Sequence, residues 1–204
     1  MTNRVCVFWV GLLGLISMSV SAAPNTTSSF YIDWSGASYN NSAKAHAMLT
    51  VNTAEGSKFT GFADNAWLAP DVDVTDFTIT ISDAESGNGT FGLSEFDFFM
   101  WNTSVTEAWP LDLSREVFGQ NTTGGAWGSD HSSDALTGDF NLFAIESSLA
   151  PTSDGGAFRI ATNAGYGDRL NLTSFRPVPI PAAFWLFGST MLGFAGVNYG
   201  RRAV

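Results

Sequence analysis

Apolar and polar residues alternate in short runs along most of the chain. In FTITIS, residues 77–82, large apolar side chains alternate with hydroxyl side chains. A period of two places the apolar side chains on one face and is typical of a half-buried β-strand. Similar runs occupy residues 30–34, 45–51, 96–101, 140–145, 158–162 and 170–175. Only residues 42–51, SAKAHAMLTV, could also begin as a helix.

The segments between these runs are rich in Gly, Asn, Asp and Ser, which tolerate the backbone conformations of turns. They cover residues 82–90, 119–134 and 152–157, and GNGTFG, residues 87–92, is predicted to be a hairpin turn rather than a nucleotide-binding loop. Seven or more short strands with such turns predict an all-β fold, an antiparallel β-sandwich of the jelly-roll type.

One strand carries a break in its pattern. The apolar positions shift from Val72 and Val74 to Phe77 and Ile79, which is out of phase by one residue. A bulge or bend is therefore predicted at the start of this strand.

The two ends of the chain differ from the rest. Arg4, an apolar stretch to Val20 and the small residues before Ala23 predict a signal peptide over residues 1–22. At the other end, residues 177–200 contain no charge, and a helix over residues 181–199 would be about 28 Å long, close to the thickness of a bilayer core. The pair Arg201-Arg202 would stop transfer and keep that end in the cytoplasm.

The tail contains a short motif before this predicted helix. Val178-Pro179-Ile180-Pro181, the apolar helix and Arg201-Arg202 together resemble the PEP-CTERM sorting tail in its VPLPA-type variant. The resemblance covers about the last 27 residues and implies recognition by an exosortase, a membrane-embedded cysteine protease, in a Gram-negative bacterium that makes exopolysaccharide. It further implies anchoring in the inner membrane before processing, and then the cell surface or the extracellular matrix. An ordinary tail anchor of a periplasmic protein is the alternative.

Removing both ends leaves a single domain, residues 23–176, with an uneven charge balance. It holds six of the nine basic residues and all 19 acidic ones, a net charge of −13. Nucleic acid is therefore not an expected partner, because phosphate binding needs clustered Lys and Arg. The only cysteine, Cys6, falls in the predicted signal peptide, so no disulfide or cysteine metal site is expected.

Two sets of residues could bind ligands. Asp71, Asp73 and Asp76 surround a strand start and could hold Ca²⁺ through carboxylates, although they do not form a known calcium-loop motif and no cofactor is the simpler expectation. Trp109 and Trp127 lie in predicted loops, where their rings could stack on a sugar while Asp130 accepts hydrogen bonds from its hydroxyls.

These observations predict a secreted or cell-surface protein with a structural or adhesive role in the exopolysaccharide matrix, not an enzyme. A surface polysaccharide hydrolase is the alternative, for which Glu95 and Asp97, expected on one face of a strand, would supply the paired acids of a glycosidase.

Overall fold

The computed structural model describes residues 26–129 and 137–179. Outside the described residues lie the predicted signal peptide, Asp130 and residues 180–204, which include Ile180 and Pro181 of the predicted sorting motif. Within them the strands are β1 (Thr27–Ser35), β2 (Lys44–Asn52), β3 (Ala66–Leu68), β4 (Val74–Ser82), β5 (Gly89–Gly92), β6 (Phe96–Asn102), β7 (Asp139–Ala144), β8 (Thr152–Ser153), β9 (Arg159–Ala161) and β10 (Arg169–Pro177). Short 3-10 helices are η1 (Ala37–Tyr39), η2 (Leu93–Glu95) and η4 (Asn163–Gly165).

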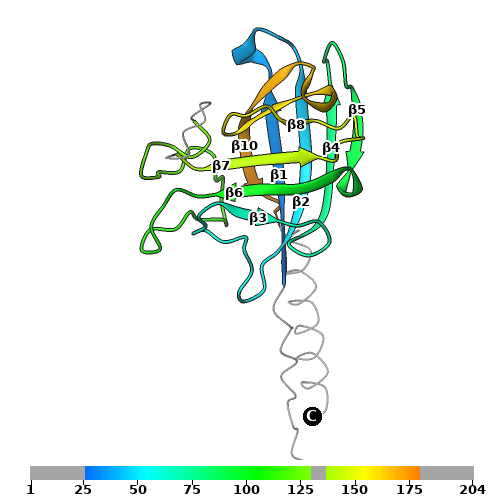
Figure 1. Ribbon diagram of the computed structural model, residues 1–204. Helices are drawn as coiled ribbons and strands as arrows, with labels where there is room; N and C mark the ends of the chain where they lie inside the picture. Colours follow the sequence, from blue (N-terminus) through cyan, green and yellow to red (C-terminus); the bar gives the residue numbers. More distant parts are fainter. Residues whose placement is uncertain (1–25, 130–136, 180–204) are drawn as a thin grey trace, which may run out of the picture.

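The strands form two antiparallel sheets. The larger sheet has the order β5-β4-β2-β1-β10-β9-β8, and the smaller one has the order β3-β6-β7. Figure 1 shows the smaller sheet lying across one face of the larger sheet, with its strands crossing at a steep angle. The all-β, antiparallel prediction is thus confirmed. The strand order differs from that of a jelly roll, because the sheets are unequal and most neighbouring strands follow one another along the chain instead of forming Greek keys.

Each of the seven alternating runs contains a strand, and the ambiguous run at residues 42–51 forms β2 rather than a helix. The short strands β3, β5 and β8 were not predicted. In particular, the prediction of a turn at residues 87–92 is corrected, because Gly89–Gly92 is β5 and pairs with β4.

The break in the apolar pattern before Phe77 is a bulge, as predicted. Thr50 pairs with Asp76, whereas the next residue of β2, Val51, pairs with Val74. Thr75 is therefore the extra residue, and its insertion returns Val74 and Phe77 to the buried face.

The first and last strands lie side by side in the larger sheet. Phe30 of β1 pairs with Pro177 of β10, and the Val178 N–H donates to the Ser29 carbonyl at 2.8 Å. The sheet therefore extends one residue into the predicted tail, and both ends of the sandwich leave from the same end of the sheet. No helix in residues 26–129 and 137–179 is long and apolar enough to cross a membrane.

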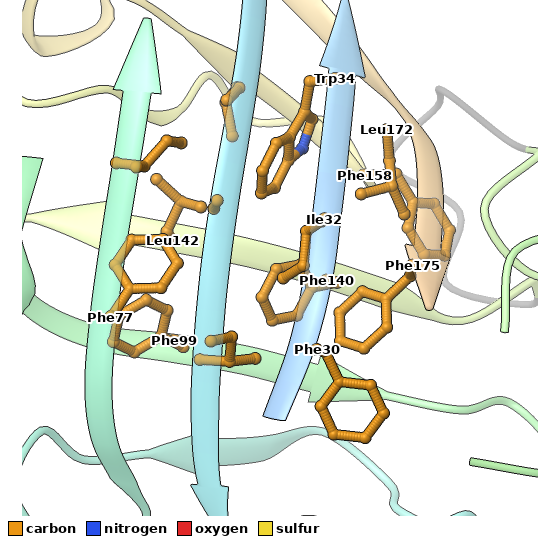
Figure 2. Packing of buried hydrophobic residues seen from close by; sticks show 14 of the residues in the cluster. Phe30, Ile32, Trp34, Phe77, Phe99, Phe140, Leu142, Phe158, Leu172 and Phe175 are labelled. Carbon is orange, nitrogen blue, oxygen red and sulfur yellow. The ribbon is translucent and has the colours of Figure 1, made fainter. Parts of the chain in front are cut away.

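Aromatic side chains fill the space between the sheets. Phe175 of β10 packs against Phe140 and Phe30, with ring centroids 5.1 and 5.2 Å apart, as Figure 2 shows. Two rings from long loops complete this cluster: Trp127 lies 5.5 Å from Phe175, and Phe59 lies 6.4 Å from it. The smaller sheet does not cover the larger one alone, because loop residues form part of the core.

Candidate functional site

The smaller sheet has an apolar surface on both sides. Its inner side packs into the core through Leu68, Phe99, Trp101, Phe140 and Leu142, which are all buried. Because side chains alternate along a strand, the residues next to these buried ones point outward. The apolar residues on this outward side are Trp67, Phe98, Met100 and Phe143, and we call them the aromatic face.

Cross-strand contacts hold the aromatic face together. Phe98 is paired with Phe143, and their rings stack with centroids 4.4 Å apart. Trp67 meets Phe98 edge-on at 4.9 Å and lies 6.0 Å from Phe143, yet 49% of Trp67 remains exposed. An indole fixed on a strand and open to solvent offers a rigid flat surface for a ligand.

Lys58 and Asp73 fix the strand that carries Trp67. The Lys58 ammonium donates to the Trp67 carbonyl at 2.9 Å and pairs with the Asp73 carboxylate at 2.8 Å. The same carboxylate oxygen accepts the Ala69 N–H at 2.8 Å. Both residues therefore hold the edge strand β3 in place through its backbone.

A groove of about 900 Å³ opens beside Trp67. Its apolar lining includes Phe62, which is 42% exposed, and its polar lining includes Asp64, Asn65 and Glu107. Asn65 is held by a hydrogen bond from the Asn102 amide at 3.2 Å, and it donates to Asp64 at 2.9 Å. The groove thus places carboxylate acceptors next to exposed rings.

A smaller cavity of about 400 Å³ adjoins the other edge of the aromatic face, between β7 and the loop that follows β8. Met100 and Phe143 line it together with Asp139 and Asn141. The buried Asp139 carboxylate accepts hydrogen bonds from the Phe158 N–H at 3.0 Å and from the Asn141 amide at 2.8 Å. Burial nevertheless raises the pKa of Asp139 to about 6, because the lost hydration outweighs these hydrogen bonds.

The described surface offers no unpaired basic side chain. All six Lys and Arg residues in the described part of the chain form ion pairs with aspartates. The pairs are Lys44–Asp83, Lys58–Asp73, Arg115–Asp112, Arg159–Asp154, Arg169–Asp154 and Arg176–Asp33. A ligand would therefore meet mainly hydrogen-bond acceptors and aromatic rings.

The structure separates the residues predicted to contact a sugar. Trp127 is fully buried, so the prediction that its ring is open to a ligand is wrong. Its N–H donates to the Asn102 carbonyl and its ring packs edge-on against Phe158, which makes it part of the core. Trp109 lies in a loop and is 80% exposed, whereas Asp130 lies outside the described residues.

The three aspartates considered for Ca²⁺ do not share one role. Asp73 is buried and bonded to Lys58 and Ala69, Asp71 occupies a turn with φ of 62°, and Asp76 is an exposed residue of β4. Within residues 26–129 and 137–179, no group of three or more His, Cys, Asp or Glu side chains is placed to hold a metal ion.

Of the acids considered for hydrolysis, Glu95 belongs to η2 rather than to a strand. Its carboxylate accepts the Gly92 N–H at 2.9 Å, an interaction of a helix N-terminus, while Asp97 is exposed at the start of β6. The expected placement of both acids on one strand face is therefore corrected.

Two residues of the predicted sorting motif are described. Val178 is half-buried against β1 and Pro179 is exposed, whereas Ile180, Pro181, Arg201 and Arg202 lie outside the described residues.

Sequence reasoning did not identify the aromatic face. In the run FDFFMW, residues 96–101, apolar residues occupy both phases of the alternation, and this was the available signal for Phe98 and Met100. Comparisons with protein-family models, curated proteins and solved structures found no match.

Proposed function

We propose that the protein is an exported surface protein that binds extracellular polysaccharide through the aromatic face. The observation that carries the proposal is the half-exposed indole of Trp67, held against Phe98 and Phe143 and flanked by a groove with acidic and amide side chains.

Sugars combine an apolar C–H surface with many hydroxyl donors. A rigid aromatic ring buries the C–H surface, while carboxylate and amide oxygens accept hydrogen bonds from the hydroxyls. The aromatic face and the adjoining groove supply both kinds of contact on neighbouring elements. The six described Lys and Arg side chains are already paired with aspartates. The surface therefore favours an uncharged or cationic ligand rich in hydrogen-bond donors over a ligand rich in phosphate.

Affinity electrophoresis of the purified protein through gels containing exopolysaccharide from the source culture tests the binding. We expect Trp67→Ala to weaken retardation by about tenfold in apparent affinity, as for an aromatic residue central to an interface. Met48→Ala is the control, because Met48 is 38% exposed on β2 of the larger sheet.

Trp109→Ala tests the other exposed indole. Loss of retardation in Trp109→Ala but not in Trp67→Ala would move the site to the loop. Unchanged retardation in both variants would contradict the proposal. Retardation that occurs only when the protein self-associates would contradict it as well. Release of new reducing ends from the polysaccharide would instead support the hydrolase.

The proposal includes sorting by an exosortase. It is supported by the resemblance of the tail, and by the position of Val178 and Pro179 immediately after β10, the last strand of the described residues. The protein would be held in the inner membrane by its tail and then released to the cell surface or the matrix.

Intact-mass measurement in cells with and without the exosortase tests the sorting. We expect a shortened protein in the supernatant of the first strain and the tailed protein in the membranes of the second. The same mass and location in both strains would rule out this route and favour a plain tail-anchored protein.

A further inference from the structure

Asn141, which lines the cavity beside β7, has a buried side-chain atom without a hydrogen-bond partner. The Asn141 amide nitrogen donates to the Asp139 carboxylate at 2.8 Å and to the Gly156 carbonyl at 3.3 Å. These two acceptors fix the orientation of the amide, because the reversed orientation would place its oxygen against two other oxygens. The Asn141 Oδ1 atom therefore faces away from them, and it has no hydrogen-bond partner although Asn141 is only 3% exposed.

A buried acceptor without a partner is unusual in a folded protein and indicates a missing donor. The cavity of about 400 Å³ that Asn141 lines is large enough to admit one. Ligand hydroxyls, ligand amines and water could all donate to the Asn141 oxygen.

Asp139 narrows the choice of donor. It lines the same cavity, and none of the ion pairs in the described residues includes it. Asp154 of the adjoining loop pairs with Arg159, the first residue of β9, and also with Arg169. A donor with a positive charge would satisfy the Asn141 oxygen and supply the cation that the Asp139 carboxylate lacks.

The cavity is continuous with the aromatic face, because Met100 and Phe143 belong to both. A sugar ring placed on Phe143 could direct one substituent towards Asn141 and Asp139. An ammonium group has three donors and no acceptor, whereas an N-acetyl group would bring a carbonyl oxygen towards two acceptors.

We propose that this cavity is a subsite for the ammonium group of an amino sugar, so that the polysaccharide recognised by the aromatic face contains residues with free amines. This inference rests on the proposed polysaccharide binding and specifies its ligand.

Three tetrasaccharides that differ only at the second carbon test the subsite. They are β-1,4-linked glucosamine, N-acetylglucosamine and glucose tetramers, titrated into the full-length protein by calorimetry. We expect the glucosamine tetramer to bind at least about tenfold more tightly than the other two, which corresponds to one charge-assisted hydrogen bond.

Asp139→Asn should remove this preference while the glucose tetramer keeps its affinity. Asp97→Asn is the matched control, because Asp97 is an exposed acid on the neighbouring strand β6 and would act only through general attraction. A lower affinity in Asp97→Asn equal to that in Asp139→Asn would contradict a specific subsite. The ligand comparison on the unaltered protein needs no variant, so it decides the matter even if Asp139→Asn does not fold.

The outcomes separate the two proposals. Equal affinities for the three tetramers, or no binding of any of them, would overturn the subsite. Polysaccharide binding through the aromatic face would fail if the exopolysaccharide did not retard the protein, or if Trp67→Ala left the retardation unchanged.

Discussion

The indole N–H of Trp127 donates a hydrogen bond to the main-chain carbonyl of Asn102 at 3.0 Å, inside the core. This bond connects a long loop to the end of β6, the central strand of the smaller sheet. The Trp127 ring also packs 5.2 Å from Trp101, so this part of the loop belongs to the core of the sandwich.

Replacement of Trp127 is expected to affect stability rather than recognition. Trp127→Ala should lower the free energy of unfolding by about 3–5 kcal/mol, because it leaves a large cavity and an unpaired carbonyl. Urea denaturation measures the loss. Trp109→Ala, at the 80% exposed indole, should change stability by less than about 0.5 kcal/mol. Similar losses in both variants would contradict the assignment of Trp127 to the core.

Gly138 should not accept a side chain. Its φ is +94°, and a Cβ atom there would lie 2.4 Å from the Trp127 ring and 2.7 Å from the Asn102 carbonyl. We expect Gly138→Ala to lower the unfolding midpoint in a thermal melt well beyond the effect of Gly119→Ala. Gly119 has a comparable φ of +85° with no atom near its Cβ position, so its variant measures the backbone cost alone, about 1 kcal/mol.

Asp139 should make stability depend on pH between about 4 and 6. Its pKa is raised from 3.8 to about 6 in the folded protein, so the folded state holds its proton after the unfolded chain has lost it. This contribution is complete below pH 4 and is lost as the pH rises through 6, by up to about 3 kcal/mol. Asp139→Asn cannot ionise, and it should gain stability relative to the unaltered protein over this interval.

Urea unfolding of both proteins at pH 4, 5, 6 and 7 measures that difference. A constant difference across the series would show that the Asp139 carboxyl titrates normally.

Asp73 is expected to stabilise β3 without a metal ion. Asp73→Ala removes the acceptor of the Ala69 N–H as well as the partner of Lys58, and it should cost about 1–3 kcal/mol. Lys58→Met should cost less, because the Lys58 side chain is half-exposed.

Calcium gives the check on this interpretation. Because a metal that binds only the folded protein raises the melting temperature by mass action, we expect Ca²⁺ to leave the melting temperature unchanged. A rise with Ca²⁺ that disappears in Asp73→Ala would restore the calcium site.

The long strands could be predicted because burial of one face imposes a period of two on the sequence. The same logic predicted a bulge or bend at the start of β4, where the structure has the extra residue Thr75 that keeps Val74 and Phe77 on one side. Strands of two to four residues, such as β8 and β5, carry too few positions to show a period. The unequal division of strands between the sheets also could not be predicted, because alternation does not identify a strand's neighbours.

The candidate site was harder to predict because position in a loop says little about exposure. Trp127 is in a segment rich in Gly and Ser, yet it fills space that the smaller sheet leaves open, whereas Trp67 is in a strand and remains exposed. Asn141 and Asp139 show no pattern in the sequence, since their importance comes from their hydrogen bonds with Gly156 and Phe158.

The pairing of β1 with β10 has a mechanical consequence. Val178 and Pro179 follow directly on β10, whose hydrogen bonds to β1 run across the strands. Tension applied there, while a polymer pulls on the opposite sheet, would load these bonds in shear and share the force among them. If the protein is held at a cell surface as proposed, the pairing of β10 with β1 would help the sandwich to resist drag.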